Sequence, residues 1–442
     1  MSNIVKTPVL LSVLVTIAGL SACNSGTSSN TSSSEPITPV TTIALPQSGQ
    51  QIQYPTGCSG TTCHTSTLGT DGYGRLVGGD NIPYGVAWAY NGSNPLTPIT
   101  RFVTDSAESD CIIDNLTGLE WPKNGRIGFI STSYSSILLT QPDYNNTDDT
   151  LNTVLWAVGM QGIKNMNSAP IKLCGYSDWR MPNVNELASL QNFGIVNSKN
   201  WLESQGITIS SFFVPIYWTS TAYAPSPTSA KWGISFSRGG LSTELPNDEI
   251  PSFTSVIPVR STSMVTVAPA QIAQTGQTIS QESGDDGALQ EGAQWVNSSQ
   301  RFEVGSGYES DCITDKLTGL MWVRDANRIP VKGSPYPRGT TWQNAIDSAN
   351  AVNSGFGICD HYDWRVPNVN ELRSLINYGA ETPSEWLNQH GFMNMRSNSY
   401  WVSTSGFVDP TSVYYIDFEN GQTIYSGSKT KTAYFQLVRS GK

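Results

Sequence analysis

The chain has 442 residues and a formal net charge of −10, and only 14% of its residues are charged. A nucleic-acid partner is not expected, because phosphate binding needs a basic surface. Binding of sulfated glycans by bulk charge is disfavoured for the same reason, although a local basic patch could still do it. The length allows two or three domains, and the low charge with 40 glycines is typical of exported, loop-rich domains that contain β-structure.

The chain begins with a segment typical of an export signal. Lys6 precedes an apolar run from Val9 to Leu20 that is too short to span a bilayer. The ending Leu20-Ser-Ala-Cys23 resembles the bacterial lipobox, which implies cleavage before Cys23 and its lipidation; ordinary secretion with cleavage nearby is the alternative. Because Asn24 rather than Asp follows, we expect a lipid-anchored protein of the cell envelope, at the outer membrane.

Beyond the signal, the chain contains a low-complexity stretch and then a tandem repeat. Residues 24–55 are rich in Ser, Thr, Pro and Gln, which predicts a flexible tether. Residues 174–187 (CGYSDWRMPNVNEL) recur without a gap as residues 359–372 (CDHYDWRVPNVNEL), so two copies of one module are joined in tandem. The expected organisation is a signal peptide (1–23), a tether (24–55), a first domain (56–262), a linker (263–274) and a second domain (275–442).

In each copy, the elements before this repeated block are predicted to be a β-hairpin and a helix. Asp114-Asn-Leu-Thr117-Gly118 and its counterpart from Asp315 to Gly319 have the composition of a tight turn between two strands. Apolar residues with helical spacing follow in both copies. They are Leu151, Val154, Leu155 and Val158 in the first copy, and Trp342, Ala345, Ile346 and Ala349 in the second.

The repeated block itself is predicted to be an extended piece, a turn and a capped helix, and we refer to it as the corner. Pro182 and Pro367 disfavour helix in the preceding residue, and an Asn and a Glu then occupy capping-box positions. The polar and aromatic residues of the corner are expected to build it: Asp178, Trp179, Arg180, Asn183, Glu186, Asp363, Trp364, Arg365, Asn368 and Glu371. An acid/base role for its Asp and Arg is the alternative, but structural ion pairs that reach Arg260 and Arg439 are favoured. Strand-like stretches close each copy, at 231–236, 256–260, 413–418 and 434–439.

The cysteines predict disulfides. Lipidation of Cys23 leaves an even number, which in an exported protein indicates pairing. Because Cys111 and Cys312 are equivalent, as are Cys174 and Cys359, we predict one bridge in each copy, Cys111–Cys174 and Cys312–Cys359. Cys58–Cys63 would then close a small local loop. A zinc site is the rival, but paired Cys-x-x-Cys spacing and matching histidines are missing.

Neither catalysis nor metal binding is well supported by the sequence. None of His64, His361 and His390 has a histidine at its counterpart position, so no catalytic residues are assigned and no enzyme is expected. Calcium is the one cofactor worth weighing, because residues 143–149 are rich in oxygen ligands. The second copy has no equivalent of that stretch and no EF-hand fits it, so we expect neither metal nor cofactor.

Ligand binding is expected where the copies differ, because tryptophans needed in both copies belong to the core. The differing regions are 122–150, 223–252 and 323–340. The last of them holds the densest basic run of the folded part, which makes a candidate ligand-binding set, with a solvated loop as the alternative. Its members are Arg324, Arg328, Lys332 and Arg338.

Taken together, these motifs resemble the Lcl C-terminal domain family, the bacterial domain of unknown function 1566. That pattern runs Arg-Phe, Asp-x-x-Thr-Gly-Leu-Met-Trp, a helix, Asp-Trp-Arg-Leu-Pro-Asn-x-x-Glu-Leu, Tyr-Trp-Ser-Ser-Thr and a final Val-Arg. The chain carries nearly all of it twice, over about 101–261 and 301–440, with Glu120 in place of the first Met and Met181 or Val366 in place of Leu.

The resemblance implies an α+β fold with two tandem C-type-lectin-like domains, each with short antiparallel strands and two helices. It also implies binding at the cell surface, since the namesake domain belongs to a collagen-like adhesin that binds host glycans. We therefore expect a non-enzymatic binding or adhesion module for a glycan or a surface protein. The alternatives are a structural envelope lipoprotein without a soluble ligand and an enzyme on a related scaffold.

Overall fold

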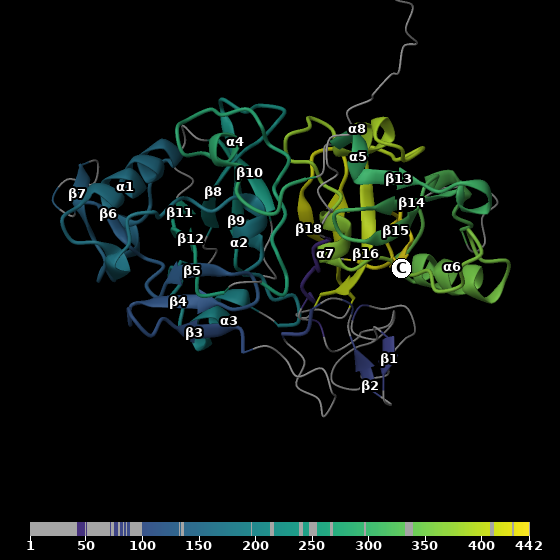
Figure 1. Cartoon of the computed structure of the whole chain (residues 1–442), viewed down its shortest axis with the longest axis horizontal. Helices are drawn as coiled ribbons and strands as arrows, with labels where there is room; N and C mark the ends of the chain where they lie inside the picture. Colours follow the sequence, from purple (N-terminus) through teal and green to yellow (C-terminus); the bar gives the residue numbers. More distant parts are fainter. Residues whose placement is uncertain are drawn as a thin grey trace, which may run out of the picture. The chain divides into compact units, whose positions relative to one another are not determined.

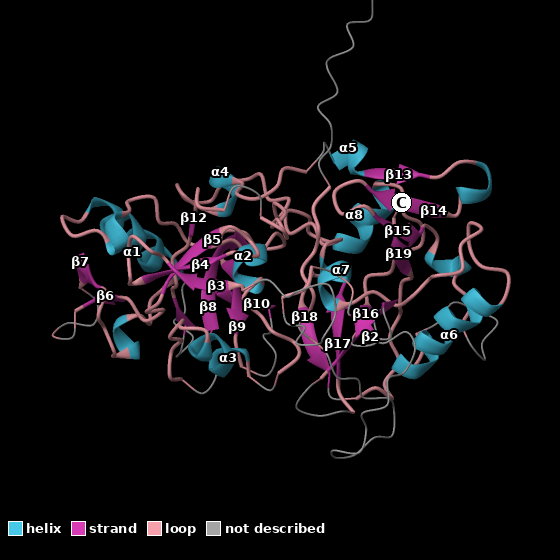
Figure 2. Cartoon of the chain, turned by 60° about the horizontal axis from the view of Figure 1, so that its bottom comes forward, coloured by secondary structure: helices cyan, strands magenta, loops and turns pink. Residues whose placement is uncertain are grey.

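The computed structural model describes residues 42–48, 50, 71, 75–77, 80–82, 84, 86–88, 100–131, 133, 137–195, 197–212, 216–237, 242–246, 254–265, 268–295, 298–331, 339–406, 411–426 and 428–441. Short helices and small antiparallel sheets alternate with long loops (Figure 2). This mixture confirms the predicted α+β class. Both copies belong to one unit, Val40–Lys442.

The first copy opens with a four-stranded antiparallel sheet in the order β12-β5-β4-β3. Its strands are β3 (Phe102–Thr104), β4 (Cys111–Asp114), β5 (Leu119–Pro122) and β12 (Arg260–Ser261). The turn between β4 and β5 closes with Asp114 opposite Leu119. Gly118 has a φ of +72° in this turn, a left-handed conformation that glycine adopts at no steric cost. The predicted hairpin is confirmed.

A second sheet and three helices complete the first copy. The sheet has the order β10-β9-β8-β11, and its strands are β8 (Ile216–Ala222), β9 (Ala230–Ser235), β10 (Ser242–Pro246) and β11 (Thr254–Ser255). The helices are α1 (Trp156–Ser168), α2 (Val184–Ala188) and α3 (Ser198–Ser204), with 3₁₀ turns at Asp149–Leu151 and Leu173–Gly175. The hairpin of β6 (Gly128–Ile130) and β7 (Leu138–Asp143) lies beside α1 (Figure 1).

Helix α1 begins later than its apolar spacing predicts. Leu151 and Val154 are buried, but they lie in a 3₁₀ turn and an extended segment before the helix. The Asn152 side chain fixes that segment, since it donates to the backbone oxygens of Gly125 and Val256 and accepts from the Val256 nitrogen. Leu151 and Val154 are therefore apolar because they are buried, although their backbone is not part of the α-helix. In the second copy, the predicted helix does begin at Trp342.

The second copy repeats this architecture. Its first sheet has the order β13-β14-β15-β19 and its second sheet the order β16-β17-β18. The strands are β13 (Phe302–Val304), β14 (Cys312–Asp315), β15 (Leu320–Val323), β16 (Ser399–Ser405), β17 (Val413–Asp417), β18 (Thr423–Ser426) and β19 (Val438–Ser440). The helices are α5 (Ser298–Arg301), α6 (Trp342–Ser354), α7 (Val369–Arg373) and α8 (Pro383–Gln389), with 3₁₀ turns at Gly307–Glu309 and Ala326–Arg328.

Three further elements precede the copies in sequence. They are β1 (Arg75–Val77) and β2 (Asp80–Ile82) before the first copy, and α4 (Asp286–Leu289) before the second. We call the described residues in 42–88 the first lead-in and residues 268–295 the second lead-in. Both overlap segments that the sequence predicted to be connections without a packed structure, the tether (24–55) and the linker (263–274). Residues 42–50 fall in the predicted tether, yet Ile43, Gln47, Ser48 and Gln50 are buried. Ala270, in the predicted linker, is buried as well.

One apolar core continues from the first copy into the second. It contains buried residues of both corners and of strands β8 and β16. The Phe193 ring meets the Tyr414 ring edge-on at 5.0 Å between centroids, and Trp232 meets Tyr378 at 5.4 Å. Each copy also keeps a core of its own around α1 or α6. Both predicted disulfides, Cys111–Cys174 and Cys312–Cys359, are confirmed and belong to these separate cores.

Candidate functional site

The corner is a capped helix in both copies, as its sequence predicts. The Asn183 side chain accepts from the Glu186 nitrogen at 2.9 Å, and the Glu186 carboxylate accepts from the Asn183 nitrogen at 2.9 Å. Asn368 and Glu371 form the same reciprocal pair at the same distances. The first backbone N–H groups of these short helices are thereby satisfied.

The glutamate of each capping box also binds the arginine of the corner. Arg180 donates two hydrogen bonds to the two oxygens of Glu186, both at 2.6 Å. Arg365 does the same to Glu371, again at 2.6 Å. Such a planar, bidentate pair is strong and directional. The arginines are thus held by the corner's own glutamates, which the sequence analysis did not assign as their partners.

The corner aspartates bind the arginines that close each copy. Arg260 donates to the two oxygens of Asp178 at 2.8 and 3.2 Å, and Arg439 donates to Asp363 at 2.7 Å. Arg260 also binds the buried Glu120, whose place opposite Arg439 is taken by Met321. Burial raises the pKa of Glu120 to about 7, although its bond to Arg260 acts in the opposite direction.

The corner tryptophans are core residues. Trp179 and Trp364 are buried, and each indole N–H donates to a backbone oxygen, that of Leu173 or Ile358. An asparagine from the long helix clamps the tryptophan backbone from both sides in each copy, Asn167 in the first and Asn353 in the second. These contacts hold both indoles inside the fold.

A cleft opens beside the first corner, among the residues that the structure describes. It has a volume of about 380 Å³. The buried side chains of Met160, Ile163 and Met181 form its apolar floor, and the exposed Leu289 adds a further apolar group to the lining. Charged side chains at its rim are Lys164, Asp178, Arg180 and Glu291. Asp178 is 60% exposed despite its pair with Arg260. The repeated residues therefore form part of the wall, but each has an internal partner.

The charged residues of this cleft that lie outside the corner have no counterpart of the same kind beside the second corner. Lys164 lies on α1, three residues before Asn167, and the matching position before Asn353 is Asn350. Lys164 pairs with Glu282 at 2.8 Å, and Glu291 lies 3.5 Å from Arg180. Glu282 and Glu291 belong to the second lead-in. Sequence reasoning missed this segment, although Gln47-Ser-Gly-Gln50 and Gln274-Thr-Gly-Gln277 reveal a second repeated motif.

The structure places two of the four predicted ligand-binding basic residues. The Arg324 guanidinium donates to the backbone oxygens of Gly391 at 2.9 Å and Ser310 at 3.2 Å, so it supports local structure. Arg328 is 66% exposed, with its nearest carboxylate, that of Asp311, at 4.0 Å. Lys332 and Arg338 lie outside the described residues, as do Cys23, Cys58 and Cys63.

The oxygen-rich stretch that was weighed for calcium has local partners. Asp148 caps a 3₁₀ turn, and Asp149 accepts from Ser211 and lies 3.6 Å from Arg126. No group of three His, Cys, Asp or Glu side chains suited to a metal occurs within the described ranges. Across those same ranges, every helix is too short or too polar to cross a membrane.

Comparison with known proteins identifies the repeated module. The family described as the Lcl C-terminal domain matches residues 110–260 and again residues 311–439, together more than half of the chain. The two matches begin beside the first disulfide cysteine of each copy and end at the closing arginine, Arg260 or Arg439. No curated protein sequence matches the chain.

Proposed function

The chain belongs to the Lcl C-terminal domain family, and we propose that it is a non-enzymatic binding module of the bacterial cell surface. In this proposal two C-type-lectin-like domains are carried by a lipid anchor at Cys23, at the outer membrane. The ligand is a glycan or a surface protein, bound for adhesion. The resemblance of the motifs to a surface adhesin domain supports this assignment.

The observation that carries the proposal is the cleft beside the first corner. The polar residues that recur in both copies are engaged with one another, as the Arg180–Glu186 and Asp178–Arg260 pairs show. The cleft adds residues that do not recur, namely Lys164 and Glu291, above an apolar floor. A hollow with an apolar base and a few convergent polar groups is the usual form of a small-ligand site.

The lining of the cleft favours a ligand with hydroxyl groups and an apolar face. Asp178 and Glu291 are exposed carboxylates at the rim and accept hydrogen bonds, whereas Lys164 donates them. Met160, Met181 and Leu289 offer an apolar surface below. Sugar rings combine these two kinds of surface, and so does a polar protein loop with one apolar side chain.

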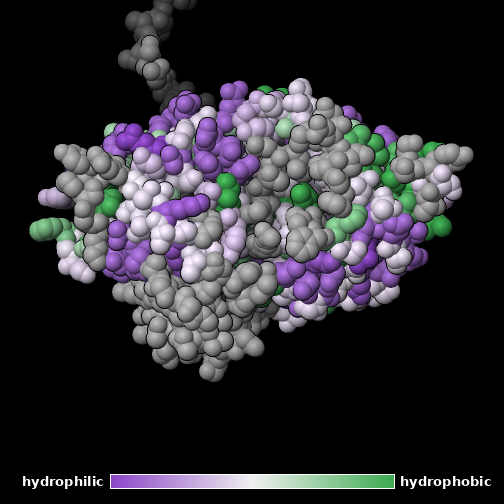
Figure 3. All heavy atoms as spheres, turned by 180° about the vertical axis from the view of Figure 1, so that it is seen from behind, coloured by the Kyte–Doolittle hydropathy of each residue, from purple (hydrophilic) through white to green (hydrophobic). Residues whose placement is uncertain are grey.

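A second candidate surface surrounds Arg328, which keeps its guanidinium exposed. On the face drawn in Figure 3, the coloured atoms are mostly hydrophilic or neutral, with apolar atoms in small separate groups. Independently of that view, the exposed guanidinium of Arg328 can donate hydrogen bonds to an acidic or hydroxyl-bearing ligand. The basic run at 324–338 therefore remains part of the proposed ligand-binding region.

A glycan array tests the proposal. The protein used should start at residue 24, because residues 42–50 are packed against the second copy. Ser283→Trp would fill the cleft from an exposed position and is expected to abolish binding. Thr278→Trp, exposed in the same segment but outside the cleft, is the matched control and should bind normally.

A parallel variant separates the two surfaces. Loss of binding in Arg328→Ala, which changes an exposed side chain, with normal binding in Ser283→Trp, would move the site to the basic run. A blank array together with no binding to surface proteins would contradict adhesion and favour a structural envelope role.

A further inference from the structure

The two lead-ins are versions of one segment. Gln47-Ser-Gly-Gln50 matches Gln274-Thr-Gly-Gln277, and each motif is followed by Asp-Gly and then by Gly-x-x-Trp. The structure gives both the same internal fold, because Pro46 forms a parallel bridge with Val86 as Ala273 does with Ala293. In both, an indole N–H then donates to the backbone oxygen of the first glutamine, Gln47 or Gln274.

Each lead-in docks on the end of a strand through its second glutamine. Gln50 exchanges two hydrogen bonds of 2.8 Å with the backbone of Ser405, at the end of β16 in the second copy. Gln277 exchanges bonds of 3.0 and 2.8 Å with the backbone of Ala222, at the end of β8 in the first copy. The glutamine amide thus satisfies both backbone polar groups of the last residue of β16 or of β8.

A buried carboxyl group bridges each lead-in to its corner. Asp71 accepts from Ser48 at 2.5 Å and from Thr404 at 2.6 Å. Asp286 accepts from Thr275 at 2.6 Å and from Thr221 at 2.7 Å. Burial raises the pKa of Asp71 to about 6 and that of Asp286 to about 7, partly offset by these hydroxyl donors. In each case a buried carboxylate therefore accepts from one hydroxyl of the lead-in and from one hydroxyl of the strand, β16 or β8, next to the corner.

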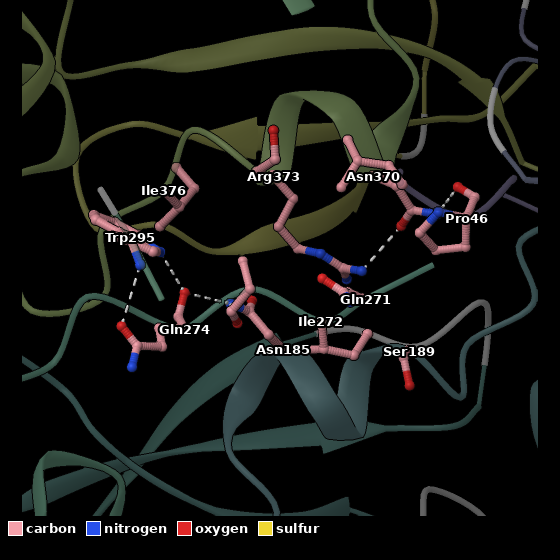
Figure 4. A pocket seen from close by; sticks show the side chains of 13 residues that line it. Pro46, Asn185, Ser189, Gln271, Ile272, Gln274, Trp295, Asn370, Arg373 and Ile376 are labelled. Carbon is pink, nitrogen blue, oxygen red and sulfur yellow. Dashed lines mark hydrogen bonds between the residues drawn. The ribbon is translucent and has the colours of Figure 1, made fainter. Parts of the chain in front are cut away.

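The corner asparagines bind the lead-in backbone in a matching way. Asn370 donates to the oxygen of Pro46 at 3.0 Å, and Asn185 donates to that of Ala273 at 3.1 Å. Figure 4 shows Asn370 directed to Pro46 and Asn185 directed to the second lead-in, with Arg373 between them. Each corner therefore carries part of a built site for a Gln-Ser/Thr-Gly-Gln segment.

The direction of docking is head to tail. The second lead-in docks on the first copy, and its Trp295 packs against the second copy, where the Arg301 guanidinium lies 4.5 Å from the centre of the indole ring. The first lead-in docks on the second copy, and its Trp88 packs against the first copy, where the Arg101 guanidinium lies 4.7 Å from the centre of the indole ring. Each lead-in thus joins one copy to the next, and the first lead-in joins the last copy back to the first.

We propose that the second corner, together with the end of β16, is an exchangeable peptide-binding site, and that its alternative occupant is the first lead-in of a second copy of this chain. Head-to-tail interfaces close into rings or extend into chains, depending on which molecule supplies the segment. The second lead-in is covalently tied to a copy on both sides. The first lead-in is tied only to the copy that follows it, so it can dock in another molecule with every contact preserved.

Concentration decides between the two arrangements. A lead-in on the same chain acts at an effective concentration on the order of millimolar, which favours self-closure at ordinary protein concentrations. Refolding at high concentration lets a second molecule compete before closure. The exchanged form then persists after dilution, because release requires the buried Gln50, Asp71 and Asn370 contacts to break.

Light scattering after size-exclusion chromatography tests the proposal on the full chain without residues 1–23. The protein is unfolded in denaturant with its disulfides intact and refolded at low and at high micromolar concentration. We expect monomer at low concentration, and dimers with longer species at high concentration that survive dilution. Gln50→Ala should shorten several-fold the time for which the associated species survive dilution, because release of the segment then breaks fewer bonds. Ser48→Ala should shorten it less.

Gln277→Ala is the matched control, since it removes the equivalent bonds of a segment that cannot leave its chain. Its associated species should survive dilution for as long as those of the parent. Near-ultraviolet circular dichroism verifies that each variant is folded. Monomer at every concentration would overturn the proposal, and so would equal persistence of the associated species of Gln50→Ala and of the parent after dilution.

Discussion

At the scale of single residues, the repeated polar side chains act as connections inside the fold. The Glu186 carboxylate serves the helix cap and the Arg180 guanidinium together. Arg101 binds Asp114 with two bonds and reaches the backbone oxygen of Ser189, so it links the first hairpin to the corner. A residue with such a set of partners recurs because the fold needs it.

Removal of Arg365 tests this interpretation. Arg365→Ala leaves the buried Glu371 carboxylate without its bidentate partner. Breaking a buried ion pair from one side costs about 3 to 5 kcal/mol, and we expect a loss of that order in the free energy of unfolding measured with urea. The exposed Arg328→Ala is the control and should change stability by less than about 0.5 kcal/mol. Similar small effects for both variants would contradict a structural role.

Glu120 gives a pH-dependent prediction with an internal control. Its pKa is raised from 4.5 to about 7 in the folded protein, so its contribution to stability is present below its unfolded pKa and is lost as pH rises through about 7. Glu120→Met copies the second copy, where Met321 occupies the site. The melting temperature of the variant should therefore rise relative to the parent between pH 5 and pH 8.

The expected size of this effect is on the order of 1 to 3 kcal/mol in favour of the variant across that range. Asp178 still binds Arg260 when Glu120 is absent, so the guanidinium keeps a partner. Met321→Glu should show the opposite trend with pH. A difference between Glu120→Met and the parent that does not vary with pH would refute the raised pKa.

At the scale of elements, short sequence motifs predicted those structures that are closed by residues near one another in the chain. The Asn-x-x-Glu spacing predicted both capping boxes, and Asp-x-x-Thr-Gly predicted both hairpins, because these structures are closed by residues a few positions apart. The pairing of the cysteines followed from the repeat alone. The start of α1 did not, since the Asn152 side chain holds the preceding segment extended through distant backbone groups.

Removal of one disulfide should destabilise each copy by a similar amount. The bridges close segments with separations of 63 and 47 residues, and the loop-entropy term depends only on the logarithm of this length. We expect Cys111→Ser/Cys174→Ser and Cys312→Ser/Cys359→Ser each to lose about 2 to 4 kcal/mol in urea unfolding. A loss confined to one pair would show that the two bridges do not play equivalent roles.

The lead-ins were the elements that sequence reasoning could not place. Their motif is short, and the partners of Gln50 and Asp71 lie more than 300 residues away in the chain. No local spacing reports such a contact. The cleft was missed for the same reason, because its rim joins α1 and the first corner to the second lead-in.

At the scale of the whole molecule, each lead-in holds the two copies together, because it docks on one copy and packs its tryptophan against the other. The core that runs through both copies and the paired lead-ins make the second copy depend on residues near the start of the chain. Removal of the predicted tether up to residue 55 would therefore remove part of the fold. The proposed ligand cleft depends equally on the second lead-in, which supplies Glu291.

Amide hydrogen exchange of two matched variants tests this docking of the lead-ins most directly. Gln50→Ala should speed exchange at the end of β16 in the second copy, around Ser405, and leave the end of β8 unchanged. Gln277→Ala should do the reverse, with faster exchange around Ala222 only. Faster exchange in the first copy on changing Gln50, or no change in either copy with both variants, would contradict the account.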